Sequence, residues 1–206
     1  MLPLGEPLRA AGLAVLLLDA RCHGRSDDAE VASMPSFAQD IEVGLEWLRR
    51  QPGVDAFRIA LIGHSVGAGA CLRVAAQDPG VAAVVSMASM AHPREFMSRT
   101  LGRRLSPSLS RAALRFTEHA IGHRFESFAP VRTIGEVRAP VLILHGQDDL
   151  VVPVTDAQAL LRAAGDGASL HLVPGAGHTS IEALAVVLPR ILGFLREAGV
   201  TGPPGD

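Results

Sequence analysis

The sequence has few cysteines, no excess of basic charge and no long hydrophobic run. Cys22 and Cys71 are the two cysteines among 206 residues, and both lie in apolar or glycine-rich stretches. Two such cysteines do not make a disulfide framework, which favours a reducing compartment. A net charge of −2 gives no reason to expect nucleic acid or an acidic membrane surface as a partner.

Signals for export or membrane insertion are also missing. The N-terminal end has no basic region of the kind that opens a signal peptide. The apolar run 13–18 ends at Asp19 and is too short for an export signal or a membrane span. We therefore expect a cytoplasmic protein without a membrane partner.

Cofactor motifs are absent as well. Residues of the metal-ligand type do not recur at helix-face or Cys-x-x-Cys spacing, so we expect no metal site. The glycines at 63, 67 and 69 do not form the G-x-G-x-x-G register, and no acidic residue ends the strand expected after them. This excludes the usual dinucleotide fingerprint, and we expect no cofactor.

The composition that remains is that of a folded protein. The chain is 48% hydrophobic and 19% charged, which excludes global disorder. Its length suits one domain with a substantial core. We find no internal repeat, and we expect a single domain over 1–206 with a loose Gly/Pro-rich tail at 201–206.

Short apolar runs alternate with amphipathic stretches along the chain. Residues 14–18 are apolar on both faces, as expected for a strand covered by helices. Within 34–50, Phe37, Ile41 and Leu45 fall on one helical stripe. The alternation predicts a mostly parallel α/β sheet of about five strands flanked by helices. The expected strands are 14–18, 57–62, 81–87, 141–144 and 170–173, and the expected helices are 5–12, 34–50, 68–77, 156–164 and 181–197.

Residues 91–136 break this alternation. They contain several prolines and serines and many arginines, among them Arg94, Arg99, Arg103, Arg104, Arg111 and Arg115. We interpret the segment as a short helical insertion over one end of the sheet. The arginines are read as a solvated face, with an anion-binding site as the alternative.

The stretch Gly63-His64-Ser65-Val66-Gly67 stands between the strand 57–62 and the helix 68–77. Such a strand–turn–helix holds its serine in a strained, exposed position, and the glycines let the backbone turn and the helix approach the sheet. The Val66 amide at the start of the helix would then donate to an oxyanion formed when Ser65 attacks a carbonyl. The motif alone is a weak signal, and its setting strengthens it.

Two later segments carry the residues that a serine nucleophile needs. Asp149 follows the strand 141–144, and His178 follows the strand 170–173. A histidine must remove the serine proton, and a carboxylate must orient that histidine and stabilise its charged form. Because the carboxyl ends of parallel strands share one edge of a sheet, we expect Ser65, Asp149 and His178 to meet there.

Four motifs now stand in order: Asp-x-Arg-x-His-Gly-x-Ser at 19–26, the elbow at 63–67, His-Gly-x-x-Asp-x-x-Val-Pro at 145–153 and Gly-x-Gly-His at 175–178. From residue 3 to about 195 the chain resembles the α/β-hydrolase superfamily, near its serine-aminopeptidase-like and dienelactone-hydrolase-like esterase branches. The resemblance implies an α/β-hydrolase fold with a short helical cap at about 91–136. It also implies a catalytic triad of Ser65, Asp149 and His178, with the Val66 amide as one oxyanion donor.

Other polar residues compete for these roles. Asp148 adjoins Asp149, but the motif places the acid fifth from His145 and so favours Asp149. His171 lies mid-strand, and His64 is expected to point to the face away from the nucleophile. His145 and His23 lie in tight turns, where the family uses them for packing, and all four of these histidines are interpreted as structural.

The chain departs from the family pattern at its N-terminal side. In the family, a strand and a His-Gly loop precede the helix with which this sequence opens, and that loop supplies the second oxyanion amide. The strand lies between those corresponding to 14–18 and 57–62. We expect an N-terminally truncated sheet, with two alternatives: direct pairing of 14–18 with 57–62, or a strand from a partner chain. Cys22 also stands where the family usually has glycine.

The resemblance implies a serine hydrolase that cleaves a small ester, thioester or amide through an acyl-enzyme. Its motifs do not choose among peptidase, thioesterase, lactonase or haloperoxidase activity, nor do they give the oligomeric state. The alternative is a domain that keeps the triad residues but does not assemble the oxyanion hole, and acts as a binding or scaffold module.

Overall fold

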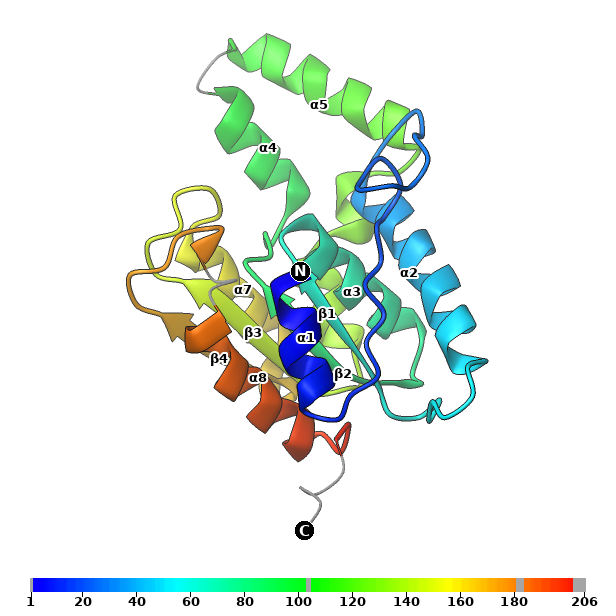
Figure 1. The fold of residues 1–206 in the computed structure, drawn as a ribbon. Helices are drawn as coiled ribbons and strands as arrows, with labels where there is room; N and C mark the ends of the chain where they lie inside the picture. Colours follow the sequence, from blue (N-terminus) through cyan, green and yellow to red (C-terminus); the bar gives the residue numbers. More distant parts are fainter. Residues whose placement is uncertain (1, 103–104, 181–183, 202–206) are drawn as a thin grey trace.

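The computed structural model describes residues 2–102, 105–180 and 184–201. Four parallel strands form one sheet in the order β1-β2-β3-β4, so β1 and β4 are its edges (Figure 1). The strands are β1 (Ile59–His64), β2 (Val81–Met87), β3 (Val141–Gly146) and β4 (Ala168–Val173). The α-helices are α1 (Leu2–Ala10), α2 (Met34–Arg49), α3 (Val66–Gln77), α4 (Pro93–Gly102), α5 (Pro107–Ile121), α6 (Pro130–Thr133), α7 (Val154–Ala164) and α8 (Leu184–Glu197). The 3-10 turns are η1 (Phe125–Phe128), η2 (Ile134–Glu136) and η3 (Gly165–Gly167).

Helices cover both faces of the sheet, which explains why the strands are mostly apolar. In β3, Val141 and Ile143 point into one hydrophobic cluster, with side chains of α2, α3 and α7. Leu142 and Leu144 point into a second cluster, with α1 and α8. Successive side chains of a strand face opposite sides, so a strand buried on both sides is apolar on both of its faces. The prediction of an α/β fold is confirmed.

The sheet has four strands where about five were expected. Residues 14–18 do not form a strand, and Leu16, Leu17 and Leu18 are 39%, 44% and 45% exposed. The local sequence suits a strand, but a strand forms only where a neighbouring strand accepts its backbone hydrogen bonds. The expectation of a strand at 14–18 is therefore wrong for the described residues.

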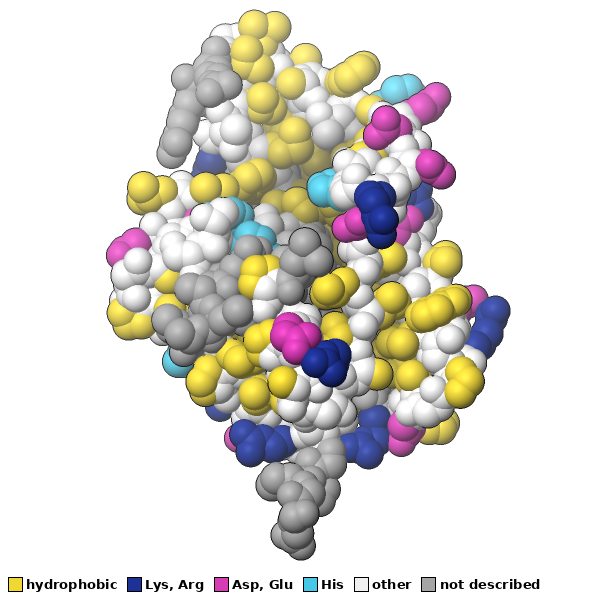
Figure 2. Space-filling view, viewed as in Figure 1, with side chains coloured by type: hydrophobic (Ala, Val, Ile, Leu, Met, Phe, Trp, Pro, Cys, Tyr) yellow, Lys and Arg dark blue, Asp and Glu magenta, His cyan; other side chains and the backbone are white. Residues whose placement is uncertain are grey.

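A cavity of about 1430 Å³ lies between 13–18 and β1, lined by both segments. Direct pairing of 14–18 with β1, one of the three alternatives, is therefore wrong. Hydrophobic side chains gather on this face between α1 and α2 (Figure 2). An upstream strand and a strand from a partner chain stay as predictions. The start of the helix expected at 181–197, and all but the first residue of the loose tail at 201–206, lie outside the described residues.

Residues 91–136 form α4, α5, η1, α6 and η2, and α4 and α5 stand above the end of the sheet at which β1 reaches α3 (Figure 1). We expect the arginines of this segment to form a solvated face, but some of them form ion pairs. Arg94 pairs with Glu118 of α5 at 2.6 Å, and Arg99 pairs with Asp156 of α7 at 2.9 Å. Arg111 and Arg115 are exposed, as the prediction requires.

The loop 19–26 is fastened to α2 by an ion pair. The Arg21 guanidinium contacts Asp40 at 2.6 Å, and the backbone N–H of Arg21 donates to the same carboxylate at 2.9 Å. The hydrogen bonds from Arg21 hold the pKa of Asp40 below its usual value. In the same loop Cys22 has a φ of 62°, a conformation that glycine adopts without strain.

Candidate active site

Ser65 occupies the turn between β1 and α3 with φ 54° and ψ −120°, a backbone conformation that side chains rarely adopt. Its own N–H donates to the carbonyl of Met87 at 2.8 Å, which anchors the turn to β2. A Cβ on Gly63 would lie 2.5 Å from the carbonyl oxygen of Gly67, so only glycine allows the helix to come this close. A Cβ on Gly67 would meet nothing within 4 Å. The close approach depends on the first glycine of the motif and not on the second.

His178 lies between the serine and a carboxylate. Its Nε2 is 3.2 Å from the Oγ of Ser65, and its Nδ1 is 2.7 Å from Oδ2 of Asp149. A carboxylate can only accept, so the assigned tautomer carries its proton on Nδ1 and leaves Nε2 to accept from the serine hydroxyl. The structure thus brings His178 together with Ser65, which lies 113 positions before it in the sequence, and with Asp149, which lies 29 positions before it.

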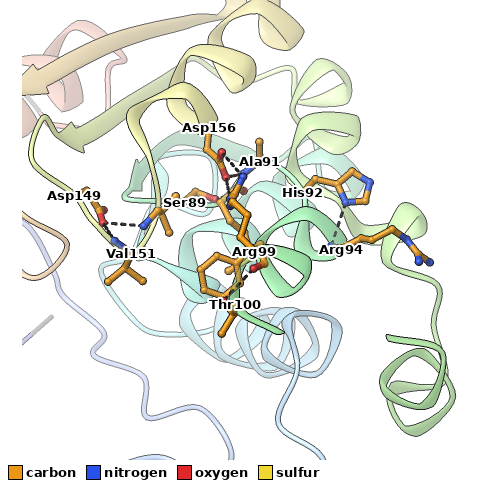
Figure 3. A network of polar contacts seen from close by, with 12 residues as sticks. Ser89, Ala91, His92, Arg94, Arg99, Thr100, Asp149, Val151 and Asp156 are labelled. Carbon is orange, nitrogen blue, oxygen red and sulfur yellow. Dashed lines mark hydrogen bonds and ion pairs between the residues drawn. The ribbon is translucent and has the colours of Figure 1, made fainter. Parts of the chain in front are cut away.

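The carboxylate of Asp149 is buried and fully partnered. Its residue is 6% exposed, and its Oδ1 accepts the backbone N–H groups of Val151 and Val152 at 2.8 Å each (Figure 3). These two bonds fix one oxygen and leave Oδ2 for the histidine. Asp148, the competing acid, is exposed. The geometry agrees with the register argument that favoured Asp149.

Two backbone contacts bring the acid loop (residues 147–153) against the loop that carries His178. The N–H of Gln147 donates to the carbonyl of Val173, and the N–H of Asp148 donates to the carbonyl of Ala176, both at 3.0 Å. A Cβ on Gly146 would lie 2.3 Å from that same Ala176 oxygen. The two loops can meet only because residue 146 is a glycine.

His64 lies against His178, contrary to the expectation that it points away. Its Nε2 donates to the backbone carbonyl of His178 at 2.8 Å, and the two ring centroids are 5.0 Å apart. In β1 an alternating apolar pattern does not reveal which side a histidine at the strand end takes. The packing of the distant 174–178 loop against this strand end decides it.

The other histidines have structural surroundings, in agreement with the sequence reading. His145 is buried, and its Nε2 donates to the carbonyl of Val152 at 2.9 Å, which supports the acid loop. The ring of His23 meets Phe37 edge-on at 5.2 Å. His171 is half-buried within β4.

The cavity beside β1 extends to Ser65, because Ser65 and Val66 are among the residues that line it. Val66 is the first residue of α3, where backbone N–H groups have no partner within the helix. Among the residues that the structure describes, no three His, Cys, Asp or Glu side chains are placed to hold a metal ion. In the same part of the chain no helix is both long and apolar enough to cross a bilayer.

A parallel sheet with a serine on a strained strand–helix turn, next to a His–Asp pair, defines the α/β-hydrolase class. Residues 1–126 match the family described as serine aminopeptidase, S33. The chain belongs to this hydrolase family.

Similar proteins span more sequence than this chain. An uncharacterized protein of Mycobacterium tuberculosis is 32% identical over 203 residues, which are 97% of this chain and 66% of the relative. The human alpha/beta hydrolase domain-containing protein 17C is 26% identical over 156 residues, covering 76% of this chain and 42% of the relative. The chain therefore spans about two thirds of the first relative and less than half of the second.

Solved structures share the fold. A Pyrococcus furiosus esterase superposes with a TM-score of 0.74 at 21% identity, covering 97% of this chain and 75% of the esterase. A putative non-heme bromoperoxidase of Mycobacterium tuberculosis gives a TM-score of 0.60 at 20% identity, covering 89% of this chain and 80% of that structure. At these identities the likeness concerns the fold.

Proposed function

We propose that this chain is a serine hydrolase that cleaves a small ester, thioester or amide through an acyl-enzyme on Ser65. The observation that carries the proposal is the position of His178, within hydrogen-bond distance of both the Ser65 hydroxyl and the buried carboxylate of Asp149. The esterase named among the similar folds makes an ester the first substrate class to test.

In the proposed reaction the Oγ of Ser65 attacks the substrate carbonyl while Nε2 of His178 takes its proton. Asp149 stabilises the imidazolium that results. The N–H of Val66 donates to the oxyanion, after which His178 gives the proton to the leaving group. Water then attacks the acyl-enzyme with the same histidine as base, and His178 returns the proton to Oγ of Ser65 as the acyl–Oγ bond breaks and the acid product leaves. No cofactor takes part in these steps.

The alternative is a domain that holds the three residues but does not turn over substrate. The cavity beside β1 favours this alternative, because it lies where the family has the strand and loop that supply the second oxyanion donor. Removing one such donor from a hydrolase typically lowers kcat by about 10²–10³.

A fluorophosphonate probe separates the two proposals. The 206-residue chain is treated with the probe and its intact mass is read beside the Ser65→Ala variant. A single adduct that the variant does not form supports the serine hydrolase. A folded chain that forms no adduct, or one that is labelled equally after Ser65→Ala, rejects it. Hydrolysis of p-nitrophenyl acetate, abolished by Ser65→Ala, then tests turnover.

A further inference from the structure

Asp156 is a buried carboxylate that the proposed reaction does not use. It lies in the first turn of α7 and is 4% exposed. Its partners come from distant parts of the chain: the N–H of Ala91 donates to Oδ2 at 3.1 Å, and the Arg99 guanidinium contacts both carboxylate oxygens at 2.9 and 3.3 Å (Figure 3). A two-pronged charge-assisted contact of this kind fixes geometry as well as supplying energy.

Both partners belong to the segment that leads into the helices above the sheet. Ala91 lies in the connection 88–92 between β2 and α4, and Arg99 lies about two turns into α4. One carboxylate therefore holds α4 just before its N-terminus, through Ala91, and again within the helix, through Arg99. Elsewhere α4 packs mainly against α5 and η1, which belong to the same insertion.

The other side of this contact is rigidly joined to the acid loop. Asp156 follows Asp149 by seven residues, and its N–H donates to the carbonyl of Pro153 at the end of that loop, at 2.9 Å. The loop itself is held by the two N–H bonds to Asp149. A displacement of α4 relative to Asp156 is therefore a displacement relative to the acid.

Apolar surface lies on both sides of this contact. Phe96, Met97 and Leu101 of α4 pack against the hydrophobic core and stay partly exposed, and Leu150 and Val151 of the acid loop are 92% and 52% exposed. A hollow with hydrophobic side chains lies between the α4–α5 pair and the body of the molecule (Figure 2). An acyl chain attached to Ser65 could bury its methylenes along such a surface only while α4 holds a fixed position.

We propose that the Asp156–Arg99 ion pair is a latch that fixes α4 over the acid loop and thereby sets the preference of the site for long acyl chains. This inference rests on the proposed hydrolase function. Asp156 and Arg99 are positioning residues, because neither side chain touches the triad. Arg99 is 39% exposed at its side chain, whereas that of Asp156 is 6% exposed, so the latch can be opened from the arginine side without placing a new group in the core.

The test compares Arg99→Gln with Arg94→Gln. Both remove one charge from α4, but Arg94 pairs with Glu118 of α5, inside the insertion. With p-nitrophenyl octanoate, Arg99→Gln is expected to raise KM by about five-fold or more, while kcat with p-nitrophenyl acetate stays within about two-fold. Arg94→Gln leaves both substrates within about two-fold, and Arg99→Lys, which keeps the charge but not the two-pronged contact, gives an intermediate octanoate KM. Equal losses on both substrates, or equal behaviour of the two glutamine variants, overturn the latch.

Hydrogen exchange gives a readout that does not require activity. Amides of 93–102 are expected to exchange about ten-fold faster in Arg99→Gln than in wild type, and at the wild-type rate in Arg94→Gln. Asp156→Asn keeps an acceptor for the Ala91 N–H and should reproduce the Arg99→Gln pattern. Unchanged exchange in Arg99→Gln rejects the latch even in an active enzyme. Absence of probe labelling in wild type rejects the hydrolase proposal instead, and the exchange comparison still decides the latch.

Discussion

Nε2 of His64 donates a hydrogen bond to the backbone carbonyl of His178, so the residue before Ser65 holds the segment that carries His178. Replacing His64 by Phe keeps a ring and removes the donor. We expect kcat for p-nitrophenyl acetate to fall about ten-fold, because small displacements of a catalytic group are costly. His64→Gln, which can still donate, should lose less. His171→Phe in β4 is the control, and an equal loss there would show a general effect on stability.

The two adjacent aspartates allow a matched comparison. Asp149→Asn removes the charge that orients and stabilises the His178 imidazolium, and in a known triad this change lowers kcat by about 10⁴. Asp148→Asn, one residue away and exposed, should stay within about two-fold of wild type. The rate of fluorophosphonate labelling is measured for both variants and for wild type. Comparable losses in the two would contradict the assignment of the acid.

The two elbow glycines should respond in opposite directions. Gly63→Ala places a Cβ 2.5 Å from the Gly67 carbonyl and 2.7 Å from Cα of Ala68, so we expect a loss of about 3 kcal/mol in the free energy of unfolding. Gly67→Ala points into open space within a helix, where alanine stabilises by up to about 1 kcal/mol. Thermal unfolding distinguishes them. A lower Tm for Gly67→Ala than for Gly63→Ala would contradict the geometry of the turn.

The two cysteines should differ in reactivity. Burial raises the pKa of the Cys71 thiol to about 12, so almost none of it is thiolate at pH 8. Cys22 lies half-buried in the 19–26 loop. A disulfide reagent such as DTNB should titrate one thiol in the native chain and two in guanidinium chloride. Cys22→Ala should lower the native count to zero, whereas a native thiol remaining in that variant would show that α3 opens readily.

The Arg21–Asp40 ion pair makes the free energy of unfolding depend on pH. The pKa of Asp40 is lowered in the folded state, so its contribution is complete above the ordinary pKa near 3.8 and is lost as pH falls through the lower folded value. Asp40→Asn should therefore cost about 1 kcal/mol at pH 7 and progressively less below pH 4. The midpoints of urea unfolding of wild type and Asp40→Asn at pH 7, 5 and 3 measure this difference. Asp28→Asn, at an exposed position, is the control, and a difference that grows on acidification would contradict the sign.

The α/β alternation and the identity of the three site residues were predictable from sequence for a local reason. Ser65, Asp149 and His178 each follow an apolar strand, and parallel strands bring their carboxyl ends to one edge. Binary patterning and turn glycines are properties of neighbouring residues, so they can be recognised without knowledge of the rest of the fold.

Long-range contacts were decided by the tertiary structure alone. Residues 14–18 have the composition of a strand, yet no described strand pairs with them, and strand formation depends on a partner that local sequence does not encode. The contact of His64 with the His178 backbone joins residues 114 apart, and that of Arg99 with Asp156 joins residues 57 apart. Sequence determined which groups can do chemistry, and the packing of distant segments determined which groups hold them in place.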